Sequence, residues 1–200
     1  MKTLYINANP KEEKDSIGLV VGSYLLNQIK NDIEVINLYE DNVPLIDSDV
    51  LSAWSKLRKE EPLTKSEEFK VKRMNELLEQ FMAADEYIIV TPLWNLSITP
   101  MLKAYLDNVV IAGKTFSYTD KGPKGLLSGK KAVIIQASGG IYSKSPGKEK
   151  DFSMPYLMNA LEFVGVADTT GIYVEGTAFR DNELILEESK KQVNDYIKKH

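Results

Sequence analysis

Short apolar runs alternate along the chain with longer stretches in which apolar residues recur at helical spacing. The short runs are rich in Val, Ile and Tyr, and we predict strands at residues 3–8, 34–38, 86–91, 131–137 and 169–174. The longer stretches predict helices at residues 19–29, 67–82, 101–110, 154–164 and 183–197. Each predicted strand is therefore followed by a helix.

Some predicted strands lack the alternation of apolar and polar residues that marks a sheet with one solvated face. In residues 87–90 and 132–135 the apolar side chains are continuous, which is typical of a parallel sheet covered by helices on both faces. Five strands with right-handed crossovers predict an α/β fold, a three-layer doubly wound sandwich with a five-stranded parallel sheet in the order 2-1-3-4-5. A ligand site is expected at the carboxyl ends of the first and third strands, where the strand order reverses.

Residues 41–63 form a long stretch without a predicted strand. Trp54 and Leu57 are apolar anchors for a helix around residues 51–58, which we interpret as an elaboration at a rim or an interface. Nothing in the middle of the chain has the composition of a linker, so residues 1–200 are interpreted as a single domain. Gly165 is expected to cap the helix that precedes it.

The composition excludes several kinds of active site. The chain has no cysteine, and its one histidine is the last residue, His200. A thiol nucleophile, a Ser-His-Asp relay and a zinc site of the Cys/His type all need side chains that the interior of this chain does not supply. We therefore predict no metal site, and we expect an enzyme with this sequence to use the chemistry of a bound cofactor.

Charge and hydropathy bear on the expected location of the protein and on its expected partners. The formal net charge is −4, and acidic and basic residues are interspersed, which argues against a nucleic-acid partner. The apolar run at the start stops at Asn7, and no later stretch approaches the length that spans a membrane. A cytoplasmic location without a membrane partner is the expectation.

The loop after the first predicted strand, residues 9–18, has the residues of an anion site. Ser16 can cap the following helix, and its hydroxyl with the backbone N–H groups of Ile17 and Gly18 could receive a phosphate at the positive end of the helix dipole. The loop alone favours a plain cap over phosphate binding. It has neither the Walker A pattern nor the G-x-G-x-x-G pattern of dinucleotide sites.

The loop after the third predicted strand, residues 91–100, suits a flat ring. Pro92 and Pro100 stiffen it, Trp94 offers a large apolar surface, and Asn95 supplies both a donor and an acceptor. A heteroaromatic with imide edges would fit, although the pattern is equally consistent with Trp94 packed in the core.

The loop after the fourth predicted strand contains Gly139 and Gly140, which would let the backbone approach a ligand closely. A Gly-Gly pair alone is more often just a turn. Three such loops at three strand ends indicate a site more strongly together than singly.

Several segments of the chain resemble the FMN-dependent NADH-azoreductases. The likeness spans essentially the whole chain and is densest from Pro92 to Gly140. The segments that carry it are Pro92-Leu93-Trp94-Asn95-Leu96, Leu102-Lys103-Ala104-Tyr105-Leu106-Asp107, Ala112-Gly113-Lys114-Thr115-Phe116-Ser117-Tyr118-Thr119, Gly122-Pro123-Lys124-Gly125 and Ser128-Gly129-Lys130-Lys131-Ala132, and it returns in residues 161–166 and 174–176.

The resemblance implies a flavodoxin-like fold and a homodimer with two FMN sites at the subunit interface. It further implies two-electron, ping-pong reduction of quinones and azo compounds, with NADH or NADPH as the donor. The implied substrate pocket contains Leu96, Tyr118 and Phe163, the last contributed by the partner subunit. The implied FMN-binding residues lie in the three loops already described: Asn9, Ser16, Ile17, Gly18, Pro92, Leu93, Trp94, Asn95, Leu96, Ala137, Ser138, Gly139 and Gly140.

Two positions depart from the family's pattern. The phosphate loop of relatives often reads S-x-S, and here the second serine is Gly18; the later loop often reads S-[RN]-G-G, and here it begins with Ala137. Each change removes a hydroxyl. The change at Gly18 would weaken FMN affinity, and the loop that begins with Ala137 also lacks a long polar side chain over the flavin, which bears on the nicotinamide preference and the range of acceptors.

Three other functions compete with this reading. An electron-carrier flavodoxin would share the fold, but it lacks the segment 112–125, and a net charge of −4 is modest for docking to redox partners. Hydrolysis with Ser138 as the nucleophile needs a base that the sequence does not offer. A receiver domain needs an aspartate after the third strand, where this chain has Thr91 and Pro92.

Overall fold

A five-stranded parallel sheet forms the centre of the molecule. The computed structural model describes all residues, Met1–His200. The sheet has the order β2-β1-β3-β6-β7, which is 2-1-3-4-5 when only its own strands are counted. The predicted strands and their order are confirmed, with ends that differ by one or two residues: β1 (Lys2–Asn7), β2 (Asp32–Asn37), β3 (Glu86–Pro92), β6 (Lys131–Ser138) and β7 (Asp168–Glu175).

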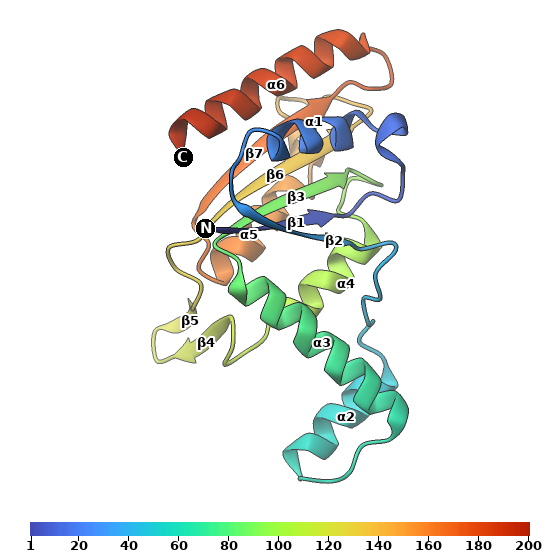
Figure 1. Cartoon of the computed structure of the whole chain (residues 1–200), viewed down its shortest axis with the longest axis vertical. Coiled ribbons are helices and arrows are strands. Elements are labelled where there is room, and N and C mark those ends of the chain that lie inside the picture. The colour runs from blue at the N-terminus through green and yellow to red at the C-terminus, as the bar shows by residue number, and fades with distance from the viewer.

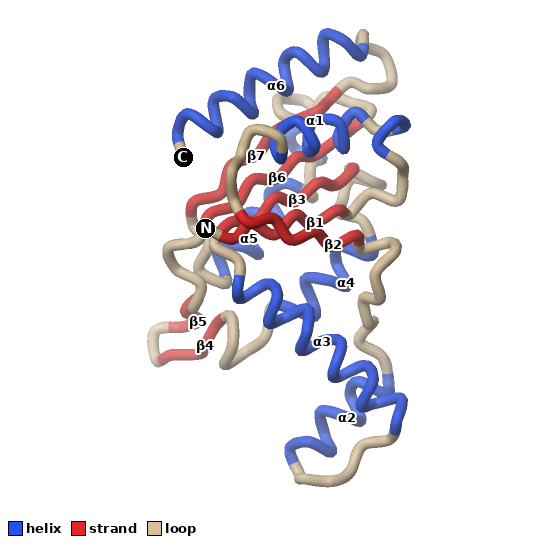
Figure 2. Tube along the Cα trace, viewed as in Figure 1, coloured by secondary structure: helices blue, strands red, loops and turns tan.

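Helices lie on both faces of this sheet (Figures 1 and 2). The helices α1 (Ile17–Leu26) and α6 (Asn182–Lys199) pack on one face, and α3 (Lys65–Ala83), α4 (Pro100–Val109) and α5 (Met154–Phe163) pack on the other. Two single 3-10 turns occur at Glu13–Asp15 and Lys148–Lys150. None of the helices combines the length and the apolar composition that crossing a lipid bilayer requires.

Alternate residues of β1 show how the sheet divides the core. Leu4 and Ile6 belong to a buried cluster with α3, α4 and α5, whereas Tyr5 belongs to a second buried cluster with α1 and α6. Successive side chains of a strand point to opposite faces, so a strand covered on both sides is apolar throughout. This explains the continuous apolar runs of the sequence.

The segment between β2 and α3 contains the helix expected there, α2 (Ser48–Arg58). It begins before the predicted start because Asp47 caps it, its carboxylate accepting from the Val50 N–H at 3.1 Å. The helix packs against α3 at the end far from the sheet (Figure 1). Lys56 and Glu67 form an ion pair of 2.8 Å across this contact.

An antiparallel hairpin outside the main sheet was not predicted. Its strands, β4 (Phe116–Thr119) and β5 (Gly122–Gly125), have four residues each, and Gly-Pro-Lys-Gly offers no apolar alternation to reveal a strand. The hairpin lies directly against the end of α5, since a Cβ on Gly125 would be 2.2 Å from the Gly165 nitrogen. Gly165 has φ +102° and caps α5 as predicted.

Candidate functional site

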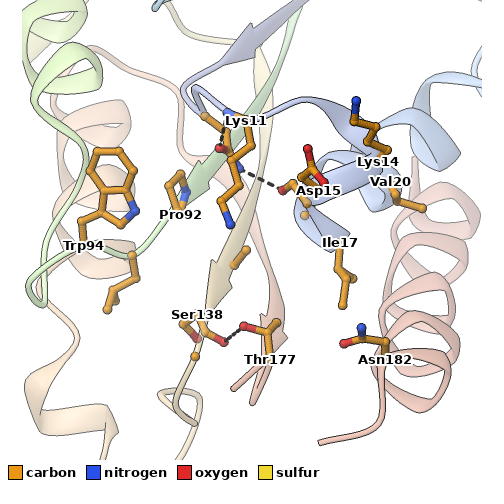
Figure 3. Close-up of a pocket in the computed structure, with 16 residues that line it drawn as sticks. Lys11, Lys14, Asp15, Ile17, Val20, Pro92, Trp94, Ser138, Thr177 and Asn182 are labelled. Carbon is orange, nitrogen blue, oxygen red and sulfur yellow. Dashed lines mark hydrogen bonds between the residues drawn. The ribbon is translucent and has the colours of Figure 1, made fainter. Parts of the chain in front are cut away.

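A cavity of about 520 Å³ opens at the carboxyl ends of β1, β3 and β6, the edge where the strand order reverses (Figure 3). Backbone bonds between the strand-end loops hold its floor: the Ala8 N–H donates to Val90 and the Leu93 N–H donates to Ala137, both at 2.8 Å. The residues lining it are Asn9, Lys11, Lys14, Asp15, Ser16, Ile17, Gly18, Val20, Pro92, Leu93, Trp94, Ala137, Ser138, Gly139, Thr177 and Asn182.

The first loop builds a donor-rich corner of the cavity. Ser16 caps α1, as predicted, with its Oγ accepting from the Leu19 N–H at 3.3 Å and from Asn9 Nδ2 at 2.9 Å. The backbone N–H groups of Ile17 and Gly18 have no acceptor within the chain. Because they stand at the positive end of a ten-residue helix and line the cavity, this corner is suited to an anion.

Gly18 is one of two glycines at which α1 packs closely against the sheet. A Cβ at this position would lie 2.9 Å from the Cβ of Ala137, a separation that side chains essentially never adopt. Gly18 and Ala137, the two departures from the family's pattern, are therefore the two sides of one contact. Gly22 has a similar role one turn later, since a Cβ there would lie 2.5 Å from the Tyr5 hydroxyl.

The second loop contains a tight turn that the sequence did not reveal. Trp94 and Ser97 exchange two backbone hydrogen bonds of 3.0 and 2.9 Å across Asn95 and Leu96. These two residues have φ +47° and +69°, the left-handed conformation that the central residues of a type I′ turn require. Asn tolerates this conformation, whereas for Leu it costs about 1–2 kcal/mol.

Trp94 stands at the mouth of the cavity (Figure 3). Its side chain is 41% exposed, and its ring meets Tyr39 edge-on with 6.3 Å between the centroids. Packing of Trp94 in the core is therefore wrong. Its role as a surface for a flat ring stays a prediction.

The third loop is ordered by β7 and the residues that follow it. The Ser138 hydroxyl donates to the Gly140 carbonyl at 3.0 Å, and the Thr177 hydroxyl donates to the Ser138 carbonyl at 3.2 Å (Figure 3). The N–H groups of Gly139 and Gly140 have no acceptor within the chain.

The one histidine of the chain is not near Ser138, the nucleophile of the hydrolase alternative. His200 lies beside Asp168 at the start of β7, which is the opposite end of the sheet from Ser138.

The structure brings most of the predicted cofactor residues together, but it separates two of the predicted substrate residues, Tyr118 and Phe163, from them. Asn95, Leu96 and Gly140 adjoin the cavity in sequence without lining it. Tyr118 and Phe163 both pack against Phe116, with ring centroids 5.4 and 4.6 Å away, on the hairpin and at the end of α5. They lie near the starts of β6 and β7, so they do not reach the cavity of their own chain (Figure 1).

Several cavity residues were not predicted. Lys11 extends over the cavity with no carboxylate in ion-pair range, while Lys14 pairs with Glu12 at 2.7 Å (Figure 3). The sequence could have predicted both residues, since they are the two lysines of the loop at residues 9–18. Thr177 and Asn182 follow β7, the neighbour of β6 in the sheet, and no local sequence pattern marks either residue.

Comparisons with known proteins agree with this geometry. The sequence matches the family described as having a flavodoxin-like fold over residues 1–197. It is 48% identical over 185 residues to the FMN-dependent NADH:quinone oxidoreductase of Geobacillus kaustophilus, covering 88% of each chain. A second relative, FMN-dependent NADH:quinone oxidoreductase 2 of Bacillus subtilis, is 45% identical over 183 residues, 88% of this chain and 87% of its own.

A solved structure shows the same likeness in three dimensions. It is an FMN-dependent NADH-azoreductase from Bacillus anthracis in complex with FMN, which is 39% identical in sequence. The two superpose with a TM-score of 0.95 over 100% of this chain and 99% of the other.

Proposed function

Because the chain belongs to the flavodoxin-like family of FMN-dependent NADH:quinone oxidoreductases, we propose that it binds FMN and reduces quinones and azo compounds with NADH by a two-electron, ping-pong route. The observation that carries the proposal is the pair of free amide groups, Ile17 and Gly18, that opens into a cavity built by three strand-end loops. Such a helix terminus at the switch point of a doubly wound sheet fits the phosphate of a flavin nucleotide.

The residues present fit FMN. The phosphate would be held by the N–H groups of Ile17 and Gly18 and the Ser16 hydroxyl, with the unpaired Lys11 cation close by. The ring would lie along residues 92–96 and 137–140. The chemistry that FMN supplies when bound is hydride acceptance from NADH and two-electron transfer to the acceptor.

The chain's own task is binding and charge stabilisation. Gly139 lines the cavity, and its free N–H would donate to the electronegative edge of the ring in the manner of an oxyanion hole. The cavity contains no histidine, and Asp15 is the one carboxylate among its lining residues. The proposal therefore assigns no protein acid or base, and protons come from solvent.

The proposal includes a homodimer whose second subunit completes the substrate pocket. Tyr118 is 76% exposed and Phe163 38% exposed, and both lie away from the cavity of their own chain. A second copy would bring its Phe163 and Tyr118 toward Leu96 of the first. Sedimentation at about twice 22.5 kDa supports this arrangement, and a monomer with full activity contradicts it.

A cytoplasmic location goes with the proposal, because NADH has to reach the site. Initial rates test the function itself. When the NADH concentration is varied at several fixed quinone concentrations, parallel double-reciprocal lines support ping-pong turnover. The same series with NADPH measures the donor preference. An electron carrier would bind FMN and give no nicotinamide-dependent turnover, but the relatives are oxidoreductases by name, which favours the enzyme.

We expect Asn95→Gly to weaken FMN binding about two- to tenfold, the effect of one lost hydrogen bond. Glycine adopts φ +47° without strain, so the substitution removes the amide and leaves the turn intact. Asn95→Ala removes the amide and also strains the turn, and it should bind FMN more weakly still. Fluorescence titration with FMN measures both; wild-type affinity in Asn95→Gly would mean that Asn95 serves the turn alone.

A further inference from the structure

We infer that Asp151 is a positioning residue for the ring side of the cofactor site, acting through the backbone of Phe152 on the Trp94–Ser97 turn. The inference rests on the proposed function. Asp151 does not line the cavity, and it lies in the segment between β6 and α5.

A single hydrogen bond ties the centre of the turn to the rest of the molecule. The Phe152 N–H donates to the Leu96 carbonyl at 2.9 Å, and no other hydrogen bond reaches Asn95 or Leu96 from outside the turn. Leu96 holds a left-handed conformation that its side chain does not favour. The position of this turn therefore depends on where Phe152 is held.

Phe152 is not held by its own side chain, which is 60% exposed. Its neighbours Asp151 and Ser153 are buried, and the Asp151 carboxylate fixes the backbone beyond Phe152. Asp151 Oδ1 accepts from the N–H groups of Ser153 at 2.9 Å and Met154 at 3.0 Å, which anchors the start of α5.

The other oxygen of the same carboxylate connects this segment to the sheet. Asp151 Oδ2 accepts from Gln136 Nε2 at 3.0 Å, and Gln136 is a fully buried residue of β6 paired in register with Thr91 of β3. The charge of the same carboxylate also reaches Tyr173 of β7. The pKa of the Tyr173 hydroxyl is raised first by burial and then by the nearby carboxylates of Asp151 and Glu175.

The buried polar side chains around Asp151, those of Gln136 and Ser153, have few other hydrogen bonds that fix their positions. Gln136 Oε1 and the Ser153 hydroxyl are buried and have no hydrogen-bond partner. Removing the carboxylate would leave three buried donors without an acceptor, and water would have to enter beneath Phe152. The Leu96 carbonyl would then lose its fixed donor, and the turn that lines the ring would shift.

The test compares Asp151→Ala with Asp47→Ala, which removes a capping carboxylate at the start of α2, far from the cavity. We expect Asp151→Ala to raise the FMN dissociation constant at least tenfold and to change the visible circular dichroism of bound FMN. Asp47→Ala should change neither. A purely structural role of Asp151 would lower the melting temperature and leave affinity and dichroism as in the wild type, which would overturn the inference.

Two further variants complete the test if Asp151→Ala does not fold. Asp151→Asn keeps an acceptor for the two backbone N–H groups and should recover most of the affinity. Phe152→Pro removes the donor to Leu96 and keeps the carboxylate, and Asp151 already has the extended backbone (φ −85°, ψ 101°) that precedes proline. Phe152→Pro should reproduce the altered dichroism; a wild-type spectrum and affinity would contradict the inference. Wild-type protein that binds no FMN would overturn the proposed function and the inference together.

Discussion

Replacing Glu86 with alanine is expected to lower the free energy of unfolding by about 3–5 kcal/mol, the range for breaking a buried ion pair by removing one partner. Glu86 opens β3 and is 1% exposed. Its carboxylate accepts from Thr3 Oγ1 at 2.8 Å, Asn31 Nδ2 at 2.9 Å and the Tyr196 hydroxyl at 2.6 Å, and it faces Lys131 Nζ at 3.3 Å. One side chain thus joins β1, β6 and α6 where the strands begin.

The loss is large because two of the partners, Thr3 and Tyr196, stay buried after Glu86 is removed. Burial is the largest cause of the raised pKa of Tyr196 and does not depend on Glu86, so the Tyr196 hydroxyl stays a neutral donor that has lost its acceptor. The variant therefore leaves several donors and the Lys131 cation without their acceptor. Chemical denaturation at a fixed FMN concentration measures the change, because bound FMN adds to the apparent stability.

The control is Glu34→Ala, which breaks an ion pair with Lys2 in which both side chains are partly exposed (34% for Lys2 and 38% for Glu34). This exposed pair should contribute no more than about 1 kcal/mol. FMN affinity should survive Glu86→Ala, because Glu86 lies at the opposite end of β3 from the cavity. A loss as small as that of Glu34→Ala would show that the buried cluster is not a main source of stability.

Restoring the family's second serine with Gly18→Ser is expected to weaken FMN binding about tenfold to a hundredfold. Without movement, the new Cβ would lie 2.9 Å from the Ala137 Cβ, so the start of α1 has to shift away from the sheet. That start carries the free N–H groups of Ile17 and Gly18. Overpacking of this kind costs about 1–3 kcal/mol, which spans the predicted loss of affinity.

The second half of this prediction is a rescue. Ala137→Gly removes the atom that the new Cβ would touch, so Gly18→Ser with Ala137→Gly should bind FMN within a few-fold of the wild type. Fluorescence titrations of the two single variants and the double variant give the coupling between the sites. If Gly18→Ser alone binds FMN as tightly as the wild type, the contact with Ala137 does not limit FMN affinity, and the only consequence of Gly18 is the absence of the serine hydroxyl.

The parallel sheet could be predicted from the sequence because burial on both faces leaves a direct trace. The continuous apolar runs at residues 87–90 and 132–135 are that trace, and the loops that follow them became the walls of the cavity. The hairpin Phe116–Gly125 left no such trace. Its short strands are held by a close backbone contact with Gly165, which no local pattern encodes.

The limits at the site have similar causes. The conformation of Leu96 contradicts its residue type, so only the assembled turn reveals it. The contact between Gly18 and Ala137 joins residues far apart in the chain. Comparing each residue separately with the family's pattern shows two missing hydroxyl groups and does not show that the two positions touch. Asp151 reaches the site only through the backbone of Phe152, and nothing in its sequence context marks it.

The central claim is that this protein carries FMN and passes electrons from NADH to a quinone. The most direct measurement is the visible spectrum of the FMN-loaded protein during anaerobic titration with NADH, followed by addition of a quinone. We predict that about one equivalent of NADH bleaches the flavin bands and that the quinone restores them. Bound flavin that does not respond to NADH would contradict the enzymatic claim and indicate an electron carrier, and a protein that binds no FMN would contradict the assignment of the cavity.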